Sequence, residues 1–497
     1  MNNLHPLYWA ERDPQKVAWW IRDKAINYNE LAVNILKGAQ WLRKQGLKTG
    51  DTVAIVAENH ENFLLFFWST QISGLYFTPI SIQFKDKEIG YILSDCRARF
   101  IATTSQQDLK IADLTNVAKI NLENWHNLIA GEPQTLIEDA CEGAEMLYSS
   151  GTTGKPKGIR NQTPGKKLGE ISKLFTKRLD LHQINNETIY LSTAPLYHSA
   201  PLKYNNMVLR SGGTSIIMPK FDALNSLKLI EKYKITHSQW VPTMFSRLLK
   251  IPKKYRTEFD LSSHKIAIHA ASPCPIPIKE AMINWWGPIL FEYYSGTEGN
   301  GQTAINSSEW LNHKGSVGKS ILGKVHIMDN HNNELPPEEI GQIFFSGGQK
   351  FSYFNDPEKT AKAYNRLGWS TLGDIGYIDS EGYLYLTDRI SHTIISGGVN
   401  IYPREVEEIL LMHPMVEDVA VFGIPNTEFG EEVKAAVQLI KNTKVSEKQL
   451  IEFCRKNLAN LKCPKTIDFH HELPRHETGK IYKNELKKLY WQGLTNN

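Results

Sequence analysis

The chain has 497 residues, which at about 100–200 residues per domain predicts about three structural units, or one large unit with an appendage. Lysine and arginine (57) nearly balance aspartate and glutamate (53), and the net charge of +4 is spread along the chain, so charge does not predict a nucleic-acid-binding surface. The five cysteines are scattered without metal-ligand spacing, which argues against a disulfide framework and a zinc site and indicates a reducing, cytoplasmic location.

The N-terminus and the apolar stretches exclude two further classes of protein. The first nine residues lack the charged-then-apolar pattern of a signal peptide. The longest uncharged run, 63–84, contains Ser, Thr, Gln and Pro, so it predicts a buried helix followed by a strand and not a membrane span. A cytoplasmic enzyme is the expectation that remains.

Helix and strand patterns alternate over roughly the first 290 residues. Leu31, Ile35, Ala39 and Leu42 recur at helical spacing, and a buried strand is predicted at 52–57. Repetition of this succession favours a mostly parallel sheet covered by helices, and therefore an α/β fold.

The pattern changes near residue 370, where short elements predict a small α+β domain. A hairpin is expected at 375–386 around the turn 379–382, and Ser446 with Gln449 forms a capping box at the start of a helix. The other predicted elements are a helix that begins at Pro403 and strands at 419–422, 433–440 and 466–469. The predicted domains are 1–388 and 391–497, with a linker at 388–391.

A predicted strand at 146–148 is followed by SSGTTGKPKG at 149–158. The three glycines of this loop let backbone amides approach an anion closely, and its four hydroxyls and two lysines supply donors and charge. Composition alone leaves a flexible surface loop as the alternative. The loop is not that of a P-loop NTPase, because Pro156 follows Lys155 where a magnesium-binding hydroxyl is required.

Six segments, in order along the chain, resemble the signature blocks of the adenylate-forming superfamily, which includes acyl-CoA synthetases, luciferases and adenylation domains of peptide synthetases. They are YSSGTTGKPKG at 148–158, PLYH at 195–198, YSGTE at 294–298, STLGD at 370–374, Asp388-Arg389 and Gly479-Lys480. The resemblance spans essentially the whole chain. It implies a large N-terminal domain of several subdomains with helix-covered β-sheets, which binds ATP and the carboxylate, and a small mobile C-terminal domain with the catalytic lysine.

The resemblance also implies ATP, magnesium and coenzyme A, and it assigns residues to the nucleotide. Tyr294 would stack on adenine, and Asp374 would bind the ribose hydroxyls with Arg389 as its companion. Thr297 would contact the α-phosphate, and Glu298 would hold magnesium, which prefers oxygen ligands. The other ATP contacts would lie in the loop: Ser149, Ser150, Gly151, Thr152, Thr153, Gly154 and Lys157.

Two residues are assigned by the resemblance to the reacting carboxylate. Lys480 would reach from the C-terminal domain and bridge the carboxylate and the α-phosphate; a solvated lysine in a basic tail is the alternative. His198 would position the carboxylate, although a lone histidine between prolines is more often structural.

Within the superfamily, segments 394–403 and 477–480 look most like those of stand-alone fatty acyl- or aryl-CoA ligases. Ser396, Gly397 and Gly398 would border the channel for the pantetheine arm, or form only a tight turn. Ser391 occupies the hinge position, where many members carry Asp or Lys.

The acid pocket is expected at segments 198–204, 269–272 and 293–303. Their small residues and the lack of an obvious cation predict a medium- to long-chain fatty acid or a bulky, apolar, ring-bearing acid. The pocket residues are His198, Ala200, Ala271, Ser272, Gly296 and Gly299.

The predicted activity is ATP-dependent ligation of this acid to CoA through an acyl-adenylate. Two alternatives stay open: an acyl-AMP ligase that loads a carrier protein, and a non-catalytic nucleotide-binding homologue. The expected partners are small molecules only, with no nucleic acid, and the expected assembly is a monomer or a homodimer.

Overall fold

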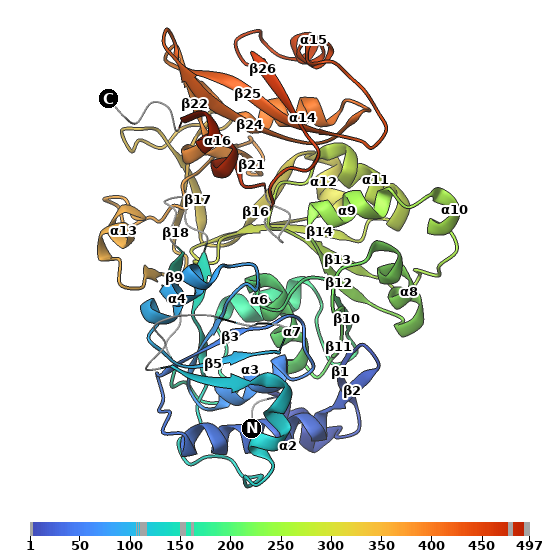
Figure 1. The fold of residues 1–497 in the computed structure, drawn as a ribbon, viewed down its shortest axis with the longest axis vertical. Coiled ribbons are helices and arrows are strands. Elements are labelled where there is room, and N and C mark those ends of the chain that lie inside the picture. The colour runs from blue at the N-terminus through green and yellow to red at the C-terminus, as the bar shows by residue number, and fades with distance from the viewer. Residues whose placement is uncertain are drawn as a thin grey trace.

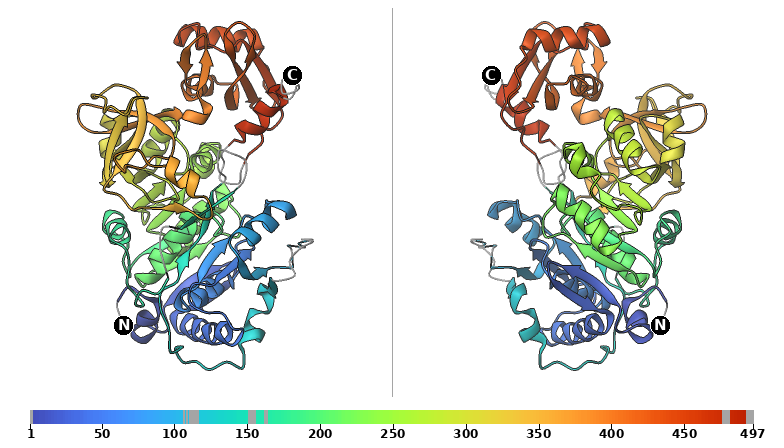
Figure 2. Two further views of the ribbon diagram at one scale, coloured as in Figure 1. Left: turned by 90° about the vertical axis from the view of Figure 1, so that its left-hand side faces the viewer. Right: turned by 90° about the vertical axis from the view of Figure 1, so that its right-hand side faces the viewer.

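The computed structural model describes residues 3–105, 107, 109, 117–149, 156–160, 164–475 and 481–491. A large N-terminal domain carries a small C-terminal domain at one end (Figure 1). In the side views of Figure 2 the small domain, in orange and red, stands at the end opposite the blue N-terminal helices. The predicted α/β fold, with a large and a small domain, is confirmed.

A five-stranded parallel sheet forms the N-terminal part of the large domain, in the order β6-β5-β3-β4-β7. Its strands are β3 (Thr52–Val56), β4 (Tyr76–Pro79), β5 (Ala98–Thr103), β6 (Ala118–Asn121) and β7 (Ala144–Glu145). The helices of this region are α2 (Tyr28–Lys44), α3 (Phe63–Ile72), α4 (Asp86–Asp95), η1 (Leu122–Asn124) and α5 (Trp125–Ile129).

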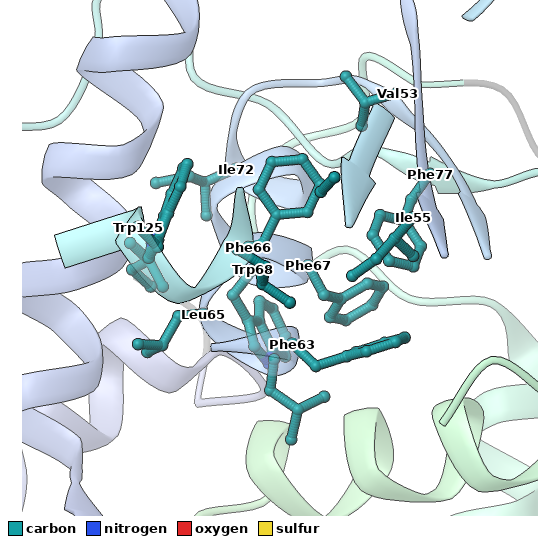
Figure 3. Close-up of a cluster of buried hydrophobic side chains, with 14 of the residues drawn as sticks. Val53, Ile55, Phe63, Leu65, Phe66, Phe67, Trp68, Ile72, Phe77 and Trp125 are labelled. Atoms are coloured by element: carbon teal, nitrogen blue, oxygen red, sulfur yellow. The ribbon is translucent and has the colours of Figure 1, made fainter. Parts of the chain in front are cut away.

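The core of this region is built around α3, all of whose residues are buried. Helix α3 packs against both α2 and β4, so none of its faces meets water. Edge-to-face ring pairs tie it to its neighbours, with centroids 5.1 Å apart for Phe67 and Phe77 and 5.2 Å apart for Phe66 and Trp125 (Figure 3). The run 63–84 is therefore a buried helix followed by a strand, as predicted. Among the described residues, no helix is long and apolar enough to cross a membrane.

A thirteen-stranded sheet runs through the rest of the large domain, in the order β17-β18-β20-β21-β16-β15-β14-β13-β12-β10-β11-β1-β2. The pairings from β1 through β11, β10, β12 and β13 to β14 are parallel, and the others are antiparallel. The strands are β1 (Val17–Ile21), β2 (Lys24–Asn27), β10 (Ile189–Ser192), β11 (Thr214–Ile217), β12 (His237–Trp240), β13 (Ile266–His269), β14 (Leu290–Ser295), β15 (Gln302–Asn306), β16 (Ser316–Leu322), β17 (Lys324–Met328), β18 (Gly341–Ser346), β20 (Asp374–Ile378) and β21 (Leu384–Arg389). The mostly parallel arrangement predicted to about residue 290 is confirmed, with the β1–β2 pairing as an antiparallel exception.

The helices between these strands are α1 (Pro6–Arg12), α6 (Lys173–Leu181), α7 (Ser199–Arg210), α8 (Ala223–Tyr233), α9 (Pro242–Leu249), α10 (Lys253–Arg256), α11 (Ile276–Trp286) and α12 (Ser307–Asn312). A third, three-stranded sheet joins β19 (Ser352–Tyr353), β9 (Lys157–Arg160) and β8 (Leu147–Ser149), and helix α13 (Pro357–Lys362) follows β19.

The small domain has its own sheet, in the order β23-β22-β25-β24, with β26 parallel to β25. Its elements are β22 (Ile394–Ser396), β23 (Val399–Ile401), α14 (Pro403–Leu411), β24 (Val416–Asn426), β25 (Gly430–Leu439), α15 (Glu447–Asn457), β26 (Thr466–His470) and α16 (Lys483–Trp491). The capping box of Ser446 and Gln449 is present. The chain passes from β21 to β22 through η2 (Ile390–His392), and we propose the boundary between the domains at 388–391.

Candidate active site

The carboxyl ends of the parallel strands gather several of the predicted residues. His198 follows β10, Ala271 and Ser272 follow β13, and Thr297 and Glu298 follow β14. Parallel strands end at the same edge of a sheet, so residues far apart in sequence come together there. This edge is where α/β proteins commonly bind their ligands.

The predicted ribose-binding carboxylate is already held by two other predicted residues. Asp374 begins β20 and pairs in register with Arg389, the last residue of β21. Arg389 Nε donates to Asp374 Oδ1 over 2.8 Å, and the Tyr294 hydroxyl donates to Oδ2 over 2.6 Å. Burial, together with the nearby carboxylate, raises the pKa of Tyr294 well above its usual value, and Asp374 raises the pKa of Arg389. The three side chains therefore form one fixed polar cluster.

Glu298 is buried and is positioned by a tyrosine from a different sheet. The Tyr353 hydroxyl donates to Glu298 Oε1 over 3.0 Å. Gly296 lets the segment lie close to its neighbours, since a Cβ there would stand 2.3 Å from Leu372 Cδ1 and 2.8 Å from Glu298 Oε2. Glu298 could supply a carboxylate ligand, and the described residues hold no group of three metal-binding side chains. This donor set fits magnesium, which is usually held by one or two carboxylates together with water and phosphate oxygens.

Only the two ends of the signature loop are described, and they are drawn together. Strands β8 and β9 are antiparallel, with Ser149 opposite Lys157. Lys157 Nζ donates to Asp356 Oδ2 over 3.0 Å, which connects the loop to α13. Ser150, Gly151, Thr152, Thr153 and Gly154 lie outside the described residues, so their contacts stay predictions.

The predicted pocket residues include one strained backbone position. Ala271 has a φ of 79°, a region that a residue with a Cβ seldom adopts and that costs about 1–3 kcal/mol. His198 is the N-cap of α7, with its ring 4.6 Å from that of Tyr197, and Ala200 lies in the first turn of α7. A strained residue at the end of β13 is typical of a site where geometry serves a ligand.

The small domain presents Gly397 and Gly398 at the tip of the β22–β23 hairpin. Ser396 pairs with Val399, and both glycines have positive φ, 56° and 79°, as a two-residue hairpin turn requires. Both glycines are exposed, as is Ser391 in η2. Their roles as channel and hinge stay predictions, and so does that of Lys480, which lies outside the described residues.

Sequence reasoning missed several polar side chains of this region. Lys203 lies in a segment that was expected to hold no obvious cation, one helical turn before Asn206, and is half-buried. Burial lowers the pKa of Lys203, and the charge of Glu145 is the largest effect that raises it. Arg178 on α6 donates to Gln302 Oε1 over 2.8 Å, with its guanidinium 5.8 Å from the ring of Tyr293. Lys203, Asn206 and Arg210 follow one another at spacings of three and four residues, and this helical spacing was the signal that one polar face exists there.

A family model described as AMP-binding enzyme matches residues 8–353, and the model of the AMP-binding enzyme C-terminal domain matches residues 405–480. The chain belongs to the AMP-binding enzymes. The predicted resemblance to the adenylate-forming superfamily is thereby confirmed.

This AMP-binding enzyme is similar over nearly its whole length to characterised proteins. It is 30% identical to a long-chain-fatty-acid–CoA ligase of Bacillus subtilis, over 96% of this chain and 92% of the relative. It matches the o-succinylbenzoate CoA synthetase MenE of Bacillus subtilis in complex with its acyl-adenylate intermediate, with a TM-score of 0.87, 27% identity and 98% of each chain covered. The same synthetase in complex with ATP and magnesium matches with a TM-score of 0.85 and 27% identity, over 98% of this chain and 99% of the other.

Proposed function

We propose that this AMP-binding enzyme is an ATP-dependent acid–CoA ligase that acts on a fatty or ring-bearing carboxylic acid. One observation carries the proposal: Asp374, Arg389 and Tyr294 form a preassembled cluster through hydrogen bonds of 2.6 and 2.8 Å. The names of the relatives, a long-chain-fatty-acid–CoA ligase and an o-succinylbenzoate CoA synthetase, support the class of reaction.

The first half-reaction forms an acyl-adenylate. A carboxylate oxygen of the acid bonds to the α-phosphorus of ATP, and the bond to the bridging oxygen breaks, which releases pyrophosphate. Asp374 accepts one hydrogen bond on each oxygen, and the remaining lone pairs are those that a ribose diol needs. Glu298 would hold magnesium, which would offset the phosphate charge, and Thr297 would contact the α-phosphate.

Lys480 is proposed to stabilise the charge that builds up between the carboxylate and the α-phosphate. Such a contact, made in the transition state, typically contributes about a hundred- to a thousandfold in rate. His198, at the start of α7, is proposed to orient the acid.

The second half-reaction transfers the acyl group to CoA. The thiol sulfur bonds to the carbonyl carbon, its proton is released, and AMP leaves with the former carboxylate oxygen. We propose that the small domain turns at Ser391 so that Ser396, Gly397 and Gly398 border the thiol channel. A two-position domain lets one site serve both steps.

The acid is proposed to lie against Ala200, Ala271, Ser272, Gly296 and Gly299, whose small side chains leave room for a chain or a ring. We also propose a cytoplasmic location, which the five free cysteines support. A monomer or a homodimer remains the proposed assembly.

The test is incubation with ATP, magnesium, CoA and a panel of fatty, aryl and short acids, with AMP and thioester measured by mass spectrometry. We expect equal amounts of AMP and thioester with a fatty or ring-bearing acid. Acyl-adenylate without any thioester would favour the carrier-loading alternative. No AMP with any acid would favour a non-catalytic homologue, and best turnover with acetate would contradict the proposed acid class.

A further inference from the structure

Apart from the linker, one ion pair joins the two domains among the described residues. Lys250 is the C-cap of α9 in the large domain, and Glu417 lies on β24 of the small domain. Lys250 Nζ donates to Glu417 Oε1, and the other oxygen of this carboxylate accepts from Gln438 Nε2 over 3.1 Å. The ammonium stands at the carboxyl end of a helix, where the helix dipole also favours a positive charge. This contact links one face of the small domain to α9.

Further charged side chains of both domains surround this ion pair. Arg247 lies one turn before Lys250 on α9, and Arg475 of the small domain pairs with Asp418, the neighbour of Glu417. Burial and the charge of Arg247 lower the pKa of Arg475, while the charge of Glu417 raises it. Burial acts to raise the pKa of Glu417, but the hydrogen bond and the charge of Lys250 hold it below its usual value. Two carboxylates of the small domain thus offset three cations at this interface.

The present position of the small domain fits the first half-reaction. The stretch that contains the proposed catalytic lysine is flanked by Arg475 and Tyr482, and both flanks face the large domain. The charge of Arg247 on α9 acts on Arg475, and the charge of Glu88 on α4 acts on Tyr482. The glycines of the proposed thiol channel, in contrast, lie on an exposed hairpin and are not packed against the large domain.

A turn of the small domain about Ser391 separates Lys250 from Glu417, because α9 stays with the large domain while β24 moves. The linker contacts change as well, since Arg404 Nη1 on α14 donates to the carbonyl oxygen of Leu386 on β21 over 2.6 Å. An enzyme that uses both arrangements in every cycle needs their free energies to lie close together. The loss of one ion pair then changes the populations measurably.

We infer that Glu417 is a positioning residue. Its ion pair with Lys250 holds the small domain in the arrangement used for acyl-adenylate formation and is broken for transfer to CoA. The inference rests on the proposed function, which supplies the two steps. Neither residue lies in the six segments that resemble the superfamily, and 167 positions separate them in the chain, so only the fold brings them together.

The experiment measures each half-reaction in single turnovers for wild type, E417Q, E417K and E452K, with an acid identified in the panel. E417Q should slow acyl-adenylate formation about two- to fivefold, the effect of one partly exposed ion pair. E417K should slow it about tenfold, because it adds a cation beside Lys250 and Arg475. Thioester formation from added acyl-adenylate should not slow in either variant. Glu452 is exposed on α15, so E452K makes the same charge change away from the interface and should behave as wild type.

A charge swap separates positioning from a general loss of stability. The double variant K250E/E417K restores the attraction with its signs reversed, and it should form acyl-adenylate faster than E417K alone. Recovery should be incomplete, because a glutamate is less favourable than a lysine at the carboxyl end of α9. High salt should reduce the difference between wild type and E417Q, since it screens a partly exposed pair. A swap that is no faster than E417K overturns the inference.

Amide hydrogen exchange tests the contact without any turnover. E417K should exchange faster than wild type and E452K on both sides of the contact, at 247–251 and 415–418, and in the linker at 388–392. If no acid is activated but E417K alone shows this faster exchange, the interdomain contact stands and the proposed function fails. If the ligase activity is found but E417K slows neither step, or slows both steps equally, the inference is overturned and the proposed function stands. Circular dichroism checks folding, and E417Q replaces E417K if the latter is unfolded.

Discussion

The two proposed halves of the site differ in how far the protein has assembled them without ligands. On the large domain, Asp374 is 6% exposed and Glu298 8%, and each carboxylate is hydrogen-bonded to a tyrosine. On the small domain, Gly397 and Gly398 sit on an exposed hairpin, next to Ile395, 55% exposed, and Phe429, 47% exposed. The carboxylates of the proposed nucleotide side are fixed by packing and hydrogen bonds, whereas the glycines of the proposed thiol side lie on an exposed hairpin.

The largest effect should come from removing the residue proposed to join the two halves. K480M is expected to slow acyl-adenylate formation by about a hundred- to a thousandfold, because its charge acts mainly in the transition state. Thioester formation from added acyl-adenylate should continue. Single-turnover assays of each half-reaction check this, with the exposed Lys488→Met as control. Adenylation that proceeds undiminished in K480M would sink the proposed mechanism.

A smaller loss is expected from the preassembled cluster. D374N should reduce kcat/KM for ATP by about tenfold to a hundredfold, because the amide accepts one hydrogen bond fewer and leaves Arg389 without its opposing charge. The melting temperature should also fall. E358Q, on an exposed carboxylate, is the control for loss of one charge. Unchanged ATP kinetics in D374N would show that the cluster is purely structural.

On the small domain the expected effect is confined to the second step. G398A places a Cβ at a φ of 79°, which costs about 1 kcal/mol, and narrows the proposed channel. Thioester formation should slow about tenfold with adenylation unchanged. G382A has the same kind of strain, at a φ of 88° in the turn between β20 and β21 of the large domain, and should leave the thiol step intact. If both variants behave alike, strain and not the channel explains the result.

The smallest expected effect is a difference in acid stability between the two domains. At pH 5.5 each buried histidine should lower the free energy of unfolding by about 1 kcal/mol. In the large domain, burial lowers the pKa of His182 and His264 to about 3 and that of His237 to about 4. In the unfolded chain these histidines bind protons below about pH 6.5, whereas in the folded protein they stay neutral. Protonation therefore favours the unfolded chain, and the free energy of unfolding of the large domain falls as the pH falls below about 6.5.

The small domain has no comparable histidine among its described residues. The pKa values of Asp468 and Glu417 are lowered by their hydrogen-bonding and charged partners, although burial acts in the opposite direction. The small domain is therefore expected to lose stability only below about pH 4.5. Amide hydrogen exchange at pH 7 and pH 5.5, corrected for intrinsic rates, should show protection lost first in the large domain. H264Q should reduce the difference. Equal loss in both domains contradicts the prediction.

The parts of the site that sequence could predict are those that a local pattern marks. Asp374 and Arg389 could be named from their signature segments, and the β20–β21 hairpin could be predicted from its turn sequence. The segments and the turn are each recognised from residues that are adjacent in the chain. Tyr353 could not, since its importance arises only where its hydroxyl, carried on β19, donates to Glu298. Lys203 was missed for the same reason, because a charged residue in an otherwise apolar segment gives no sign of what it faces.

The amino-acid order by itself determined the family, the alternation of helices and strands, the small C-terminal domain and the residue types of the nucleotide site, because hydrophobic period, turn residues and signature segments are properties of short stretches. Only the tertiary structure decided that Tyr294 and Arg389 divide the two oxygens of Asp374, and that two lysines share the ring of Tyr353. These contacts join residues that lie up to about 200 positions apart, and the free energy of a charge depends on the neighbours that folding brings to it.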